Sequence, residues 1–190
     1  MKWFSFVLVA CVALSSCQKE LRYDVDPGTT GGTSGSGGSG SSGGSSYYIK
    51  GKRNDTTFSY ATNAAATITT TSGVNSLAMI AMAPSPSIEL LNLDISFFTT
   101  GVTTGTYSEA DNLSLNVIVL GLYNGNSAGN TYASGGSLLT GAPPLTITIL
   151  TKTSTEITGT FSGTLYAPDA TGLPSVPAAF TGGSFDLPIK

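Results

Sequence analysis

Apolar and polar residues alternate along most of the chain from Tyr47 onward. Over residues 91–97, Leu, Leu, Ile and Phe occupy every second position, with Asn, Asp and Ser between them. The stretches 147–149, 157–165 and 185–189 show the same period of two, which is the period of a β-strand with one buried and one solvated face. The sequence therefore predicts an all-β domain.

The residues between these stretches are typical of tight turns. Glycine pairs and the Asn-Gly-Asn triplet at 124–126 separate the apolar runs, as hairpin turns require. The run at 113–120 becomes apolar on both faces, which predicts a central strand, and residues 61–66 predict a helical turn before a strand at 67–71. About nine or ten short strands favour an antiparallel β-sandwich over residues 47–190, with a flattened β-barrel as the alternative.

Residues 1–16 have the layout of a bacterial signal peptide. Lys2 precedes an apolar run from Trp3 to Leu14, which is shorter than the roughly twenty residues of a membrane-spanning helix. The end of this run resembles the lipobox of bacterial lipoproteins, in which the cysteine is lipidated and becomes the mature N-terminus: Leu14, Ser15, Ser16 and Cys17. The resemblance implies that the segment before Cys17 is removed and that Cys17 anchors the protein in the outer membrane.

The segment after the cysteine predicts a tether. Residues 18–20 partly resemble the export signal of Bacteroidetes-type surface lipoproteins, but Leu21 stands where a second acidic residue belongs. Both faces of the outer membrane therefore remain open. Residues 28–46 contain only Gly, Ser and Thr, which cannot offset the entropy lost when a backbone is ordered. We expect residues 17–46 to form the lipidated cysteine and a disordered tether, whose Gly/Ser/Thr part spans roughly 25 Å on average.

The composition excludes several classes of function. The formal net charge is −3 and charged residues make up 10% of the chain, so the sequence predicts no basic surface for nucleic acid. Histidine is absent, and the two cysteines, Cys11 and Cys17, both precede the domain. A Ser-His-Asp triad, a cysteine nucleophile, a Cys/His zinc site and an internal disulfide are therefore ruled out for the domain. We expect no cofactor and no enzymatic activity.

Two groups of side chains near predicted turns are candidate ligand contacts. Tyrosine rings can stack on sugars and asparagine amides can bind hydroxyls, which gives four candidate glycan contacts: Tyr123, Asn124, Asn126 and Tyr132. Strand-end tyrosines also cap a core, and the sequence leaves both interpretations open. Glu109 and Asp111 offer oxygen ligands for calcium, with a solvated turn as the alternative, because their spacing does not match an EF-hand loop.

Charged residues elsewhere give two further hypotheses. Two carboxylates that meet across the fold could catalyse glycoside hydrolysis, and six acids are candidates for such a pair: Glu89, Asp94, Glu109, Asp111, Glu156 and Asp169. Lys50, Lys52 and Arg53 form a basic cluster beside the tether. This cluster suits either anionic lipid head groups or an edge strand that charge protects from aggregation.

The C-terminal part of the chain resembles an uncharacterised family of Bacteroidetes-type lipoproteins. The residues that carry the resemblance are the runs 157–165 and 180–189, together with Gly105, Thr106 and Tyr107. The resemblance implies a C-terminal β-hairpin and an envelope location, and it carries no known activity.

These observations predict a membrane-anchored, non-enzymatic binding or structural module of the cell envelope, with a glycan or an envelope protein as its partner. A glycan-processing enzyme with a carboxylate pair is one alternative. A fimbrial or adhesin subunit, in which an incomplete sheet accepts a neighbour's strand, is another. The sequence leaves the oligomeric state open.

Overall fold

The computed structural model describes residues 47–114, 116–126, 131–169 and 172–190. These residues belong to one compact unit. The predicted signal peptide, the tether and the lipobox residues Leu14, Ser15, Ser16 and Cys17 lie outside the described residues. Within the described ranges, none of the helices has the length and apolarity that a membrane crossing requires.

The domain is all-β and antiparallel, as predicted. Two short helical segments, η1 (Glu109–Ser114) and α2 (Ser137–Thr140), interrupt the strands. The strands in chain order are β1 (Tyr48–Arg53), β2 (Thr56–Tyr60), β3 (Thr62–Thr71), β4 (Val74–Met82), β5 (Leu90–Phe97), β6 (Gly105–Ser108), β7 (Val117–Asn124), β8 (Thr131–Ala133), β9 (Thr146–Lys152), β10 (Glu156–Pro168) and β11 (Pro174–Pro188).

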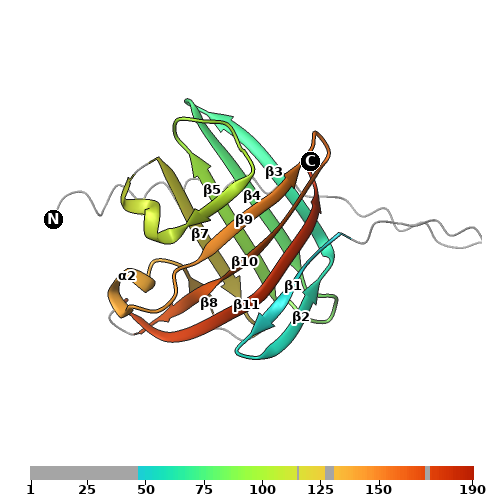
Figure 1. Cartoon of the computed structure of the whole chain (residues 1–190). Helices are drawn as coiled ribbons and strands as arrows, with labels where there is room; N and C mark the ends of the chain where they lie inside the picture. The colour runs from blue at the N-terminus through green and yellow to red at the C-terminus, as the bar shows by residue number, and fades with distance from the viewer. Residues whose placement is uncertain (1–46, 115, 127–130, 170–171) are drawn as a thin grey trace, which may run out of the picture. The chain divides into compact units, whose positions relative to one another are not determined.

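The strands form one continuous sheet that nearly closes into a barrel. Its order is β2-β1-β11-β10-β8-β7-β5-β4-β3, and β9 pairs with β10 and carries β6 on its other side. Figure 1 shows β9, β10 and β11 at the front of this barrel and β4, β5 and β7 behind them. Of the two arrangements expected from the sequence, the continuous sheet corresponds to the flattened barrel.

The barrel closes where β2 passes into β3. Only Ala61 separates these two strands, so one stretch of chain pairs with β1 through β2 and with β4 through β3. On the other side of β3, Ala66 forms a parallel bridge with Ile189, and the Lys190 N–H donates to the Ala66 carbonyl at 2.9 Å. The predicted helical turn at 61–66 is therefore wrong. A bulge in this part of β3 and three buried alanines at 64–66 let the strands approach closely instead.

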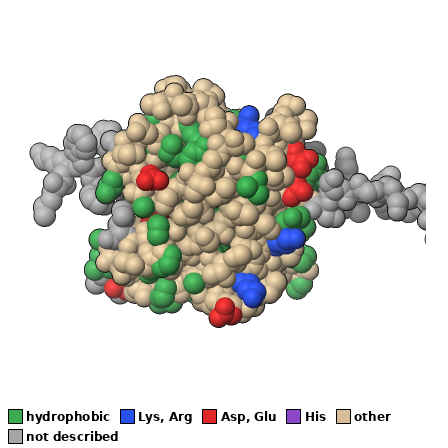
Figure 2. Space-filling model, in the orientation of Figure 1, with side chains coloured by type: hydrophobic (Ala, Val, Ile, Leu, Met, Phe, Trp, Pro, Cys, Tyr) green, Lys and Arg blue, Asp and Glu red, His purple; other side chains and the backbone are tan. Residues whose placement is uncertain are grey.

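The alternating pattern fills the barrel with apolar side chains. In β5, Leu91, Leu93, Ile95 and Phe97 are fully buried, while the residues between them lie on the outer face. The predicted C-terminal hairpin is formed by β10 and β11, in which Ile157 pairs with Leu187. Figure 2 shows that the front face, which carries these strands, consists mainly of uncharged polar side chains and backbone.

Two expectations about strand position need correction. The run at 113–120 is not one strand, because Leu113 lies in η1 with 78% of its surface exposed and β7 begins at Val117. The Asn112 side chain explains this boundary, since it exchanges two hydrogen bonds with the Val119 backbone and takes the place of a strand partner. The central position predicted for the second half of the run is confirmed, because β7 lies between β5 and β8. Similarly, the basic cluster is not on an edge strand, since β1 pairs with both β2 and β11.

Candidate functional site

A polar cavity of about 220 Å³ opens at the end of the barrel where β1 ends, β5 begins and β7 ends. Strands that are far apart in the chain contribute to it because the antiparallel order brings their ends together. The residues that line it are Arg53, Asn54, Glu89, Tyr123, Gly125, Asn126, Tyr132 and Ala178. The cavity therefore contains a cation, an acid, two tyrosines and two asparagines.

The turn between β1 and β2 positions two of these residues. Asn54 and Asp55 have positive φ angles of 46° and 66°, as the two central residues of a type I′ hairpin turn require. The Asn54 backbone N–H donates to the Ala179 carbonyl at 2.9 Å, and its Oδ1 accepts from the Ala179 N–H at 2.8 Å. This double contact fixes the turn against β11 and holds Arg53 at the rim of the cavity.

Arg53 lies between an aromatic ring and an acid. Its Cζ is 4.4 Å from the centroid of the Tyr123 ring, and its Nη1 is 3.9 Å from Glu89 Oε1. The second distance is too long for a hydrogen bond. In the described part of the chain the guanidinium has no hydrogen-bond acceptor. Its N–H donors are therefore available to solvent or to a ligand, since 29% of the side chain is exposed.

Tyr60 holds the Glu89 side chain. The Tyr60 hydroxyl donates to Glu89 Oε2 at 2.5 Å. Burial raises the pKa of Tyr60 well above its usual value, and the hydrogen bond and charge of Glu89 raise it further, while Arg53 acts in the opposite direction. The phenol therefore remains a donor across the physiological pH range, and one oxygen of Glu89 is committed to it.

The two tyrosines of the cavity wall also belong to the core. Tyr123 is only 1% exposed, and its ring centroid lies 5.9 Å from those of Tyr132 and Phe180. Its hydroxyl has no hydrogen-bond partner among the described residues. Tyr123 is therefore a core residue whose hydroxyl is buried, unlike that of a capping tyrosine that reaches water, and one part of its side chain borders the cavity.

The asparagines at and just after the end of β7 have different positions. Asn126 lines the cavity, and its Oδ1 accepts from the Ser87 hydroxyl at 3.0 Å and from the Ile88 N–H at 2.9 Å, which holds the loop before Glu89. The Asn124 side chain instead accepts from the Thr131 hydroxyl at 2.8 Å. Of the four residues predicted as glycan contacts, Tyr123, Asn126 and Tyr132 line the cavity, while Asn124 does not.

Glu109, the first residue of the predicted calcium pair, is a structural residue. It is 1% exposed, and its carboxylate accepts hydrogen bonds from the Gly135 N–H at 2.6 Å, the Ser137 hydroxyl at 2.9 Å and the Leu145 N–H at 3.1 Å. Asp111 is exposed in η1 and is not among these partners. Donor groups thus surround Glu109 where a cation would have to lie. This geometry does not support the calcium interpretation, and the described residues contain no cluster of three or more metal-binding side chains.

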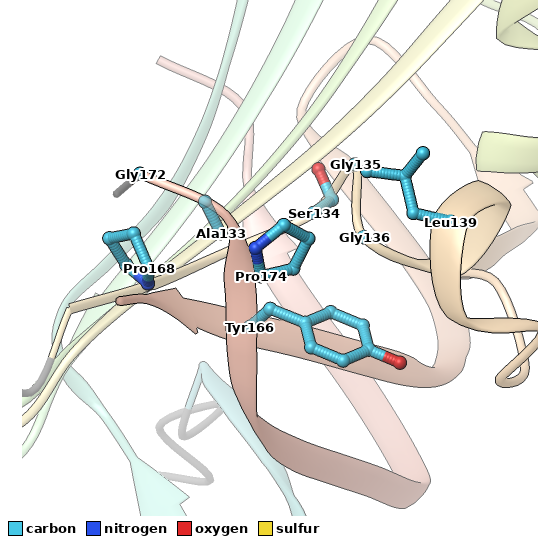
Figure 3. A pocket seen from close by; sticks show the side chains of 9 residues that line it. All are labelled: Ala133, Ser134, Gly135, Gly136, Leu139, Tyr166, Pro168, Gly172 and Pro174. Atoms are coloured by element: carbon cyan, nitrogen blue, oxygen red, sulfur yellow. The ribbon is translucent and has the colours of Figure 1, made fainter. Parts of the chain in front are cut away.

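A second cavity, of about 280 Å³, lies next to this Glu109 network and is mainly apolar. Figure 3 shows Pro168 and Leu139 at opposite ends of it, with Pro174 and Tyr166 between them. The Tyr166 hydroxyl is 2.5 Å from the Thr140 hydroxyl, and a Cβ added to Gly136 would lie 2.3 Å from Tyr166 Cδ2. The ring is therefore packed under the chain before α2 and has its polar atom paired.

The other five acids considered for a catalytic pair are not among the described residues that line the polar cavity. Glu156 lies near Asp186, whose charge raises the pKa of Glu156. Asp94 lies on the outer face of β5 beside Asn92, and Asp169 accepts from the Leu173 N–H in the β10–β11 turn. Of the acids that the structure describes, Glu89 alone lines the polar cavity.

Sequence reasoning missed the role of Arg53 and Asn54. The sequence pattern placed Arg53 in a basic cluster with Lys50 and Lys52 and assigned no role to Asn54. The signal was present, because Asn-Asp between two runs of strand-forming residues indicates a two-residue hairpin turn and so places Arg53 at a strand end. Comparisons with protein-family models, with curated proteins and with solved structures gave no match.

Proposed function

We propose that the protein is a lipid-anchored binding module of the outer membrane, and that the polar cavity takes a small saccharide unit. The observation that carries this proposal is the Arg53 guanidinium, which makes no hydrogen bond to a described residue, in a cavity that the partly exposed Tyr132 also lines. Aromatic walls and unpaired hydrogen-bond donors are what a hydroxyl-rich ring needs for binding.

The size and composition of the cavity agree with a single sugar ring. Its volume of about 220 Å³ is below the roughly 300–1,000 Å³ that drug-sized ligands require. Among the described residues that line the cavity, Glu89 is the single carboxylate. It can accept a hydrogen bond from a hydroxyl, but a glycoside hydrolase needs a second acid. This composition supports binding over the carboxylate-pair enzyme.

The position of the cavity also agrees with a tethered binding module. The strand β1 runs from Tyr48, the second described residue of the domain, to Arg53 at the rim of the cavity. At about 3.3 Å per residue these two ends are roughly 17 Å apart. Figure 1 shows the start of β1 and the β1–β2 turn on different sides of the barrel. The tether would therefore join the domain at the opposite end of β1 from the cavity.

A glycan array probed with lipid-free protein tests the binding proposal. The lipid-free protein for this test is produced from Gln18 onward, so it contains the whole compact unit of residues 43–190. We expect binding to a subset of glycans that Arg53→Gln abolishes, while Lys50→Gln, on the same strand, retains it. Lys50 is a suitable control because its Nζ lies over the Tyr48 ring, away from the cavity. An array without any bound glycan, or binding that is equal in both variants, would refute the proposal.

The lipid anchor has its own test. Wild-type protein should incorporate labelled palmitate and sediment with membranes, and Cys17→Ser should lose both properties because the thiol that carries the lipid is missing. Protease treatment of intact cells then distinguishes the two faces of the outer membrane. A Cys17→Ser protein that still incorporated palmitate would contradict the anchor.

A further inference from the structure

We infer that the cavity selects an acidic sugar, with Arg53 as the specificity-determining residue that binds the sugar carboxylate. This inference rests on the proposed saccharide-binding function and deepens it. It follows from the balance of donors and acceptors in the cavity, from the way in which Arg53 is held, and from the position of Glu89.

The free polar groups of the cavity are mainly donors. The amide oxygens of Asn54 and Asn126 both accept hydrogen bonds from the protein. Their amide nitrogens have no described acceptor and remain free to donate. Arg53 adds its guanidinium N–H groups, whereas one of the two Glu89 oxygens is already bound to Tyr60. A ligand rich in acceptors satisfies this set better than a ligand that mainly donates.

Arg53 is prearranged for a carboxylate. Its stacking on the Tyr123 ring at 4.4 Å restricts the orientation of the guanidinium. A guanidinium binds a carboxylate through two parallel hydrogen bonds of about 2.7–2.9 Å, and the Glu89 carboxylate at 3.9 Å does not make these bonds. The stacked guanidinium therefore has two parallel donors available, and little side-chain entropy would be lost on binding.

The negative charge of Glu89 should weaken the binding of an anionic ligand. Removing this charge should therefore raise the affinity, which gives a second test of the inference. Its carboxylate lies beside Arg53 and repels a sugar carboxylate bound there. In Glu89→Gln the charge is removed, while the amide oxygen can still accept from the Tyr60 hydroxyl. The two variants Arg53→Gln and Glu89→Gln should consequently change acidic-sugar affinity in opposite directions, which a general loss of folding cannot produce.

The experiment compares sugars that differ only at carbon 6. Glucuronate with glucose, and galacturonate with galactose, are titrated into the lipid-free protein from Gln18 and followed by NMR chemical shifts. We expect one acidic sugar to bind about tenfold more tightly than its neutral counterpart, which corresponds to about 1.4 kcal/mol. Arg53→Gln should remove this preference for the acidic sugar. Arg53→Lys should reduce the preference, because the two parallel donors of the guanidinium are replaced by a point charge. Glu89→Gln should increase the preference severalfold.

Each other outcome has a definite meaning. Neutral sugars that bind as tightly as the acidic ones would overturn this inference and leave the proposed saccharide-binding function standing. Absence of binding for all four sugars and for the glycan array would overturn both. An Arg53→Lys protein with an undiminished preference would refute the two-bond contact, and melting curves of each variant identify any loss of folding.

Discussion

Two glutamates, Glu109 and Glu89, show how the same side chain serves two different purposes in one barrel. Glu109 is 1% exposed and accepts hydrogen bonds from three groups of the protein, the Gly135 and Leu145 N–H groups and the Ser137 hydroxyl. Glu89 has a side chain that is 21% exposed, one short hydrogen bond from Tyr60, and a loose ion pair with Arg53 at 3.9 Å. The first carboxylate is saturated by its own chain, and the second is not.

The difference indicates where a ligand can act. A buried charge persists only when donors or opposite charges compensate its loss of hydration, and Glu109 has this compensation within the protein. Its network joins η1, the chain before α2 and the chain before β9. Around Glu89, by contrast, the Arg53 guanidinium makes no hydrogen bond to any residue that the structure describes. Glu109 therefore contributes to stability, and the region around Glu89 is where we propose that a ligand binds.

The largest expected effect comes from removing the saturated carboxylate. Glu109→Ala leaves the three donors without their acceptor in a buried site, and we expect the free energy of unfolding to fall by about 3–5 kcal/mol. Urea denaturation followed by circular dichroism measures this loss. Asp111→Ala is the matched control, because Asp111 is exposed in the same helical segment, and it should change stability by less than about 0.5 kcal/mol. A Glu109→Ala loss as small as that of the control would contradict the structural role.

Gly136 tests the packing that adjoins this network. An added Cβ would lie 2.3 Å from Tyr166 Cδ2, so Gly136→Ala must displace the ring or the chain before α2, at a cost of about 1–3 kcal/mol. Binding at the polar cavity should be unchanged, because Gly136 does not line it. Gly101→Ala serves as the control, since no atom lies within 4 Å of its added Cβ. Equal melting temperatures for the two variants would argue against the close contact.

Asp94 is a third carboxylate, partly buried on β5, that accepts a hydrogen bond from Asn92. Burial raises its pKa from 3.8 to about 6, and the hydrogen bond from Asn92 lowers it only in part. Because the folded state binds the Asp94 proton more tightly than the unfolded state, the contribution of Asp94 to stability is fully present below pH 3.8 and is lost as the pH rises through about 6. We expect Asp94→Asn to flatten the pH dependence by about 1–3 kcal/mol over this window. Urea denaturation of both proteins at a series of pH values measures the difference, and parallel curves would exclude the effect.

The smallest expected effect on stability comes from replacing Glu89, the carboxylate that the protein does not saturate, by glutamine. Glu89→Gln should alter the free energy of unfolding by less than about 1 kcal/mol, because it weakens only an exposed ion pair and keeps an acceptor for Tyr60. Glu109→Gln should destabilise more, since its amide NH₂ would face protein donors. Urea denaturation of the two Gln variants compares them directly. A Glu89→Gln variant that is the less stable of the two would reverse the assignment of roles.

The sequence by itself determined the strands, because the alternation of apolar and polar residues is a local property of a chain with one buried face. The alternation at 91–97, 157–165 and 185–189 corresponds to β5, β10 and β11. Where local pattern and tertiary contacts disagree, the prediction was wrong. The 113–120 run divides into η1 and β7 because Asn112 bonds to the Val119 backbone, a contact that periodicity does not encode.

The candidate site was accessible to sequence reasoning only in part. Tyr123, Asn126 and Tyr132 lie within one short stretch of the chain, so their chemistry could be read together. Arg53 and Glu89 reach the same cavity from β1 and from the loop before β5. Antiparallel register and barrel closure bring them there, and burial decides that Glu109 is saturated while Arg53 is free. These are properties of contacts between distant segments, which only the tertiary structure decided.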